Sequence, residues 1–92
     1  MDLKSGNIVI FRGEGKGVVT DWNGKPSYVV GARFTNPTNL WDENGRYRGK
    51  AEPTKYDIIK VIDGSSIEEP TKVFRTSAKL DELPIIWEEG KE

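Results

Sequence analysis

Short apolar runs rich in β-branched residues, separated by glycine-containing turns, make up the first two thirds of the chain. Residues 7–12 (NIVIFR) and 17–22 (GVVTDW) are too short for typical helices and are bounded by glycines. We therefore predict two strands joined as a hairpin. Asn23-Gly24 then supplies the two positive-φ positions of a type I′ turn, which predicts a second hairpin.

A third strand is predicted over residues 27–34 (SYVVGARF), directly after Pro26. Because side chains alternate along a strand, Val30 and Phe34 are expected on one face and Arg33 on the other, toward water. The following residues, 35–39 (TNPTN), have the composition of a loop.

Two later segments also predict strands. Asn44-Gly45 repeats the hairpin signal between LWD and RYR. Residues 56–63 (YDIIKVID) have the clearest strand pattern in the chain, with Ile59 and Val61 expected on one face and Ile58 on the other.

Several short strands without a long helix are typical of a small, strongly bent barrel. We predict a mainly β domain, a small SH3-like barrel of four to six short strands, over residues 1–64. Residues 65–92 are predicted to be an acidic tail, with a short helix over residues 77–83 that Pro84 ends, or an extended segment. The tail either packs on the barrel or extends from it.

The composition excludes several classes of enzyme. The chain has 92 residues, enough for one domain with a thin core, and it contains no cysteine and no histidine. Zinc enzymes, Ser-His-Asp hydrolases and Cys-His nucleophiles are therefore excluded. Asp21 and Asp57 could share acid-base work only if the fold brought them together. We predict a protein that is not an enzyme, with no catalytic residues, no metal and no cofactor.

Charge and hydropathy indicate a cytoplasmic protein. No apolar run is long enough to span a membrane, and the start of the chain lacks the features of a secretory signal. The net charge is −1, which argues against sequence-independent DNA binding. Residues 1–62 are mildly basic and residues 63–92 are acidic.

The stretch GEGKG, residues 13–17, has the composition of a phosphate-binding loop, because glycines let backbone N–H groups approach an anion. A P-loop requires Ser or Thr after its lysine, where this chain has Gly17, and a helix after the loop, where this chain has VVTDW. We therefore predict a hairpin tip.

The segment RYRGK is the best candidate ligand-binding surface, because guanidinium groups bind phosphate and aromatic rings stack on bases or sugars. The alternative is that Trp41 and Tyr47 are cross-strand partners beside the turn and that the arginines form a solvated face. The candidate partner-binding residues in the body of the protein are Trp22, Arg33, Trp41, Arg46, Tyr47, Arg48 and Lys50.

The tail contains a second candidate surface. Leu83, Ile85 and Trp87 lie among acidic residues, a pattern of apolar anchors with an acidic rim that suits a basic groove on a protein partner. The alternative is that these side chains cap the open end of the barrel, because a domain this small rarely leaves so much apolar surface exposed.

Two stretches resemble known families. Residues 6–19 (GNIVIFRGEGKGVV) resemble the KOW-type signature of SH3-like barrels in transcription and translation proteins, although such segments usually have an acidic residue where this chain has Asn7. That resemblance implies contact with RNA or the ribosome. The succession GNIVIF, GVVTDW, WDENGRY and YDIIKV is similar to small β-rich proteins of bacteriophages, which implies a phage origin and a barrel and implies no activity.

We therefore predict a non-catalytic binding module, encoded by a phage, that engages a host protein as a modulator or inhibitor in the bacterial cytoplasm. The alternative is a nucleic-acid or nucleotide-binding module that uses the arginine and aromatic rim. Binding to phosphates would weaken steeply with salt, whereas an apolar protein interface would respond little. Edge strands permit a weak homodimer as well as a monomer.

Overall fold

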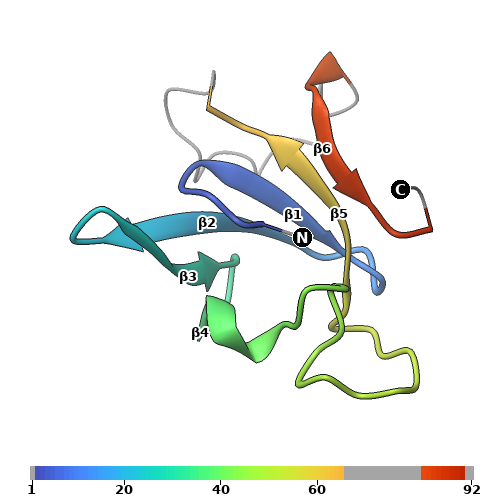
Figure 1. The fold of residues 1–92 in the computed structure, drawn as a ribbon. Coiled ribbons are helices and arrows are strands. Elements are labelled where there is room, and N and C mark those ends of the chain that lie inside the picture. Colours follow the sequence, from blue (N-terminus) through green and yellow to red (C-terminus); the bar gives the residue numbers. More distant parts are fainter. Residues whose placement is uncertain (1, 66–81, 91–92) are drawn as a thin grey trace.

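Six antiparallel strands in a single sheet form the body of the protein (Figure 1). The computed structural model describes residues 2–65 and 82–90. The order across the sheet is β4-β3-β2-β1-β5-β6, and the prediction of a mainly β domain with four to six short strands is confirmed. The elements are β1 (Asn7–Phe11), β2 (Lys16–Trp22), β3 (Lys25–Val30), β4 (Thr35–Pro37), the 3-10 turn η1 (Thr38–Leu40), β5 (Ile58–Asp63) and β6 (Ile85–Glu88).

The first two hairpins form where the sequence predicts them. β1 and β2 pair antiparallel on either side of the glycine-containing turn. Asn23 and Gly24 have φ angles of 52° and 79°, and Trp22 pairs with Lys25. These are the features of a two-residue type I′ turn, so this prediction is confirmed.

The third strand is shorter than predicted. β3 ends at Val30, and residues 31–34 turn the chain into β4, with Gly31 N donating a hydrogen bond to Phe34 O at 2.8 Å. The ring of Phe34 lies so close to Gly31 that a Cβ atom on residue 31 would overlap it. The missing side chain therefore lets Phe34 fold back over the turn. Residues 35–37, predicted as loop, form β4 and pair with β3.

A bulge in β5 changes which of its side chains face the core. Simple alternation places Ile58 and Val61 on opposite faces, but both lie in the same buried cluster. The register with β1 shifts between Ile10 and Phe11, so Ile59 is an extra residue in β5. The assignment of Ile58 to the face opposite Val61 is therefore wrong, because a pattern of period two cannot show an insertion.

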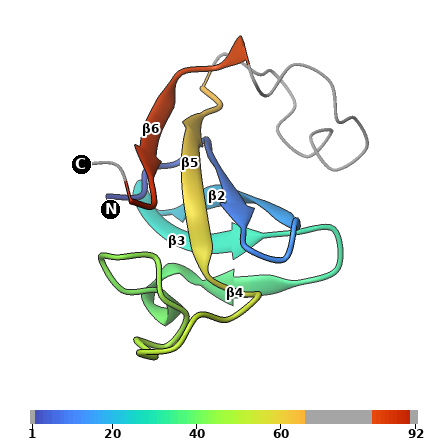
Figure 2. The ribbon, with the colours of Figure 1, turned by 90° about the vertical axis from the view of Figure 1, so that its right-hand side faces the viewer.

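The sheet curves around its larger apolar cluster. In Figure 2, β5 runs across the direction of β2 and β3. A smaller cluster, built on Ile8, Val18 and Ile62, lies on the opposite face of the sheet. The larger cluster, called the main core below, consists of Val9, Phe11, Val19, Val29, Trp41, Ile58 and Val61.

The segment between η1 and β5 bridges the two ends of the sheet. It carries Trp41 into the main core, and its turn at Gly45 reaches β5, where Ile58 N donates to Gly45 O at 2.8 Å. A Cβ atom on Gly45 would also lie 3.0 Å from the ring of Trp87 in β6. The sheet itself is open, with β4 and β6 as its edges. The segment after η1 runs from the end of β4 toward β6 and lies between these two edges.

β6 comes from the predicted tail and extends the sheet beside β5. Trp87 lies opposite Val61 in the pairing and packs on the main core, while Leu83 packs on the smaller cluster. Both side chains thus cover apolar parts of the sheet, whereas Ile85 is exposed. The short helix predicted over residues 77–83 lies outside the described residues except for its last two positions. Residues 2–65 and 82–90 include no helix of the length and apolarity needed to cross a membrane.

Replacing Gly45 with alanine is expected to destabilise the protein more than the same change at Gly24. The two glycines have φ angles of 80° and 79°, so alanine is strained at each by about 1–2 kcal/mol. A Cβ atom on Gly24 meets nothing within 4 Å, whereas one on Gly45 meets the backbone oxygen of Ile58. We expect a further loss of about 1–3 kcal/mol for G45A in urea unfolding. Equal losses would show that Gly45 is needed only for its φ angle.

Candidate ligand-binding groove

A groove of about 420 Å³ opens beside the main core. Its volume falls in the range of about 300–1,000 Å³ that is typical of ligand sites. Five aromatic side chains from separate parts of the chain line it, together with Gly13, Gly15, Asn36 and Lys55. The aromatic residues are Phe11, Phe34, Trp41, Tyr47 and Tyr56.

The five rings form one continuous series of contacts. The ring centroids of Phe34 and Phe11 are 5.6 Å apart, and those of Phe11 and Trp41 are 5.8 Å apart. The series continues from Trp41 to Tyr47 at 5.7 Å and from Tyr47 to Tyr56 at 5.3 Å. Aromatic pairs attract one another at centroid distances of about 4.5–7 Å, so each ring helps to hold its neighbours in place.

Asp42 builds the turn that brings Tyr47 into this series. Its Oδ1 accepts a hydrogen bond from Asn44 N at 2.9 Å, and its backbone O accepts one from Gly45 N at 3.0 Å. Of the Asn44-Gly45 pair, only Gly45 has a positive φ, so the chain makes a type I turn with a glycine bulge instead of the predicted type I′ turn. The strands predicted on either side of this turn do not form, and one isolated bridge takes their place. The turn places Tyr47 opposite Trp41 in an isolated β-bridge.

The groove has a buried floor and an accessible wall. Phe11 and Trp41 form the floor and are only 6% and 7% exposed. Tyr47 and Tyr56 form the wall, and Tyr56 is 52% exposed. The indole Nε1 of Trp41 donates a hydrogen bond to Tyr56 O at 2.8 Å, which fixes the floor to the wall. A ligand would therefore meet exposed aromatic surface on a packed base.

Glycines keep the groove open on the side of the β1–β2 turn. A Cβ atom on Gly15 would lie 3.4 Å from the ring of Phe11, and one on Gly13 would lie 3.0 Å from the Cβ of Lys55. Gly13 N also donates to Lys55 O at 3.0 Å. The GEGKG stretch is thus a hairpin tip, as predicted, and its glycines leave Phe11 accessible from the groove.

A buried carboxylate holds the loop that begins at Tyr47 and leads to Tyr56. The side chain of Asp57 is 1% exposed. Its Oδ1 accepts hydrogen bonds from Tyr47 N and Thr54 Oγ1, and its Oδ2 accepts one from Thr54 N, each at 2.9 Å. Because these donors lie at the two ends of residues 47–54, one carboxylate ties the ends of the loop together.

Two arginines neutralise Asp57 and link it to the residue after β6. Asp57 Oδ2 lies 3.4 Å from Arg12 Nη2 and 3.3 Å from Arg46 Nη1. Glu89 Oε1 lies 2.7 Å from Arg12 Nη2 and 3.9 Å from Arg46 Nη2. The four charges sum to zero and alternate in sign, so each arginine lies between two carboxylates.

The charged state of Asp57 suits a structural role. Burial alone would raise its pKa, but hydrogen bonds from Tyr47 N, Thr54 and Arg12 outweigh burial and lower the pKa to about 2. The pKa of Arg12 is raised, chiefly by its hydrogen bond to Glu89. At neutral pH Asp57 is therefore ionised and surrounded by donors, which does not suit a general acid or base. Asp21, the other carboxylate considered, is exposed near the end of β2.

Some predicted binding residues lie at the groove. Trp41 and Tyr47 line it and face each other across the turn, as the cross-strand alternative predicts. Arg48 places its Cζ 5.5 Å from the centre of the Tyr47 ring, and Lys50 follows in the same exposed loop. Arg46 is only 28% exposed and is paired with Asp57, so it is not part of a solvated face.

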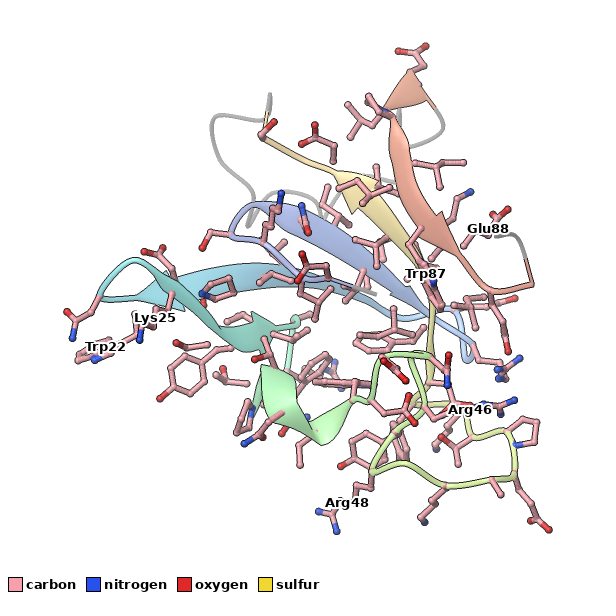
Figure 3. All side chains as sticks on the ribbon, in the orientation of Figure 1. Trp22, Lys25, Arg46, Arg48, Trp87 and Glu88 are labelled. Carbon is pink, nitrogen blue, oxygen red and sulfur yellow. The ribbon has the colours of Figure 1, made fainter. Side chains whose placement is uncertain are left out.

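Other predicted residues lie elsewhere. Trp22 is 68% exposed at the β2–β3 turn, and Figure 3 shows it beside Lys25, far from Arg46. Arg33 is exposed in the β3–β4 turn. The residues Leu83, Ile85 and Trp87 lie in β6 or just before it, and of these Trp87 approaches the loop through Gly45.

The sequence prediction missed most of the groove and the carboxylate that holds its loop. One signal was present for Asp57, because Thr54 precedes it by three residues and threonine and aspartate at short spacing often bond to each other or to nearby backbone. No local pattern marks the groove, since its rings come from distant positions. The missed groove residues include Phe11, Phe34, Lys55 and Tyr56.

Acid is expected to destabilise the natural protein by about 2 kcal/mol more than the Asp57→Asn variant between pH 5 and pH 2. The pKa of Asp57 is about 2 in the folded protein and about 3.9 in an unfolded chain. Its contribution is therefore complete above the unfolded value and is lost as the pH falls toward 2. The variant starts about 2–4 kcal/mol less stable at pH 7. Urea unfolding across this pH range tests the prediction, and parallel profiles would contradict it.

Arg46 and Arg48 are expected to differ in their contribution to stability. Arg46→Ala should lower the free energy of unfolding by about 1–2 kcal/mol, because it removes a charged partner of the buried Asp57. Arg48→Ala should change it by less than about 0.5 kcal/mol, since this side chain is exposed. Denaturant unfolding of the two single variants is the measurement. Equal losses would show that the pairing of Arg46 with Asp57 has little energetic effect.

Comparison with known proteins adds no relative to this description. The chain matches no protein-family model, no curated protein and no solved structure. What the protein binds is therefore inferred from the groove itself.

Proposed function

We propose that the protein is a non-catalytic binding module that holds a short extended segment of a partner protein in the aromatic groove. The uninterrupted series of rings from Phe34 to Tyr56 is the observation that carries this proposal. Aromatic side chains offer a large contact area at a low cost in conformational entropy, which is why they are enriched in protein-binding hot spots.

The groove is also suited to binding because its parts are fixed before a ligand arrives. Asp57 ties the ends of residues 47–54, and the hydrogen bond from Trp41 Nε1 to the backbone O of Tyr56 anchors the backbone that carries the exposed ring. A preformed site loses less entropy on binding than a loop that must become ordered. The geometry therefore favours recognition without a large rearrangement.

A protein ligand fits this surface better than a nucleic acid. Arg46 is engaged by Asp57, Trp41 is buried in the floor, and Trp22 lies far from Arg46. Nucleic-acid binding relies on several cations that neutralise phosphates, and the net charge of the chain is −1. Nucleic acid stays the second candidate, supported by Arg48 and its contact with Tyr47.

We also propose that the partner is a host protein and that a phage-encoded module modulates or inhibits it in the bacterial cytoplasm. This part depends on the similarity of the strand and turn sequences to small β-rich bacteriophage proteins. The groove supports binding of a protein segment, and it does not identify the partner.

Selection from a library of short random peptides tests the proposed function. Tyr56→Ala should weaken binding of the selected peptides by at least about tenfold, because it removes the most exposed ring of the series. Trp22→Ala is the matched control, since Trp22 is also an exposed aromatic residue but lies outside the groove. Isothermal titration calorimetry measures both variants. Failure to select any peptide, or an equal loss in the control, would contradict the proposal.

The same protein titrated with oligothymidine and oligouridine at two salt concentrations tests the second candidate. Binding that falls steeply with salt and is lost in Arg48→Ala would favour a nucleic-acid module over the proposed function. No binding at low salt would remove that candidate.

A further inference from the structure

We infer that the groove selects a proline-containing peptide segment that carries an acidic side chain beside its prolines. This inference rests on the proposed function and adds the chemistry of the ligand. It follows from the shape of the aromatic wall and from the cations that lie on it.

The wall suits a segment in the polyproline II conformation. Such a segment is extended and has little conformational entropy to lose, and its flat proline rings pack well between aromatic side chains. Here the rings of Phe34 and Tyr56 stand at the two ends of the series. Gly13 and Gly15 lie along the same groove without side chains, which leaves room for the backbone of a ligand.

Cations of the protein itself occupy positions over the two tyrosine rings. Lys55 Nζ lies 5.2 Å from the centre of the Tyr56 ring, and Arg48 Cζ lies 5.5 Å from that of Tyr47. Within the described parts of the chain, neither Lys55 nor Arg48 takes part in a salt bridge. A basic ligand would be repelled from this wall, and a carboxylate beside the prolines would be attracted to it.

The acidic residues of the described chain leave this preference in place, because none of them lines the groove. Asp57 and Glu89 are neutralised by Arg12 and Arg46. Glu14 is exposed at the tip of the β1–β2 turn and does not line the groove, whereas Lys55 does. The charge that a ligand meets inside the groove is therefore positive.

Three synthetic peptides of equal length test the inference on the full-length protein. The first has prolines flanked by aspartate, the second has the same prolines flanked by lysine, and the third has the aspartates with the prolines replaced by alanine. The first is expected to bind at least about tenfold more tightly than either of the others. Calorimetry gives the affinities, and amide chemical shifts show whether the residues around Tyr56 and Phe34 respond.

A charge reversal tests whether Lys55 binds the carboxylate of the peptide. Lys55→Glu should weaken the aspartate peptide by at least about tenfold and strengthen the lysine peptide. Lys25→Glu changes the net charge equally but lies at the β2–β3 turn beside Trp22 (Figure 3), so it should leave both affinities unchanged. An equal effect of the two variants would overturn the role of Lys55.

The outcomes separate the inference from the proposed function. If library peptides bind in the groove but the lysine or alanine peptide binds as well as the aspartate peptide, the ligand chemistry inferred here is wrong and the binding module stands. If neither library peptides nor these three peptides shift the groove residues, the proposed function is wrong as well.

Discussion

The carboxylate of Asp57 accepts bonds from both ends of the loop between residues 47 and 54, and the shape of the groove depends on that interaction. Isolated charges are costly to bury, so a carboxylate at 1% exposure is tolerated only with several donors around it. Tyr47, Thr54, Arg12 and Arg46 supply these donors. A loop with little regular structure thereby acquires one geometry, which fixes the position of Tyr47 at its start and of Tyr56 just after its end.

The floor of the groove depends on irregularities in the sheet as much as on its strands. The bulge at Ile59 turns Ile58 toward the main core, and Ile58 in turn bonds to Gly45. On the other side, Gly31 lets Phe34 fold back across its turn. A regular sheet with the same apolar residues would bury its strands equally well, but it would present the rings in a different arrangement.

The strands and turns were largely predictable because their signals are local. Asn23-Gly24 encodes its turn type directly, and the β-branched runs mark the positions of β1, β2 and β5 in the sequence. The end of β3 was missed because the packing of Phe34 against Gly31 is a contact within a turn that alternation does not describe. The groove was missed for a different reason. Its rings come together through long-range packing, and no spacing in the sequence marks them.

The pairing of Arg12 and Arg46 with both Asp57 and Glu89 joins the groove loop to the end of β6. When two events such as ligand binding in the groove and attachment of β6 to the sheet affect each other, each changes the free energy of the other by the same amount. A ligand that strengthens the attachment of β6 through these pairs is itself bound more tightly when β6 is attached, by the same free energy, and detachment of β6 weakens ligand binding by that amount. The ion pairs thus connect the edge of the sheet with the groove, although β6 lies far along the sequence from the residues that line the groove.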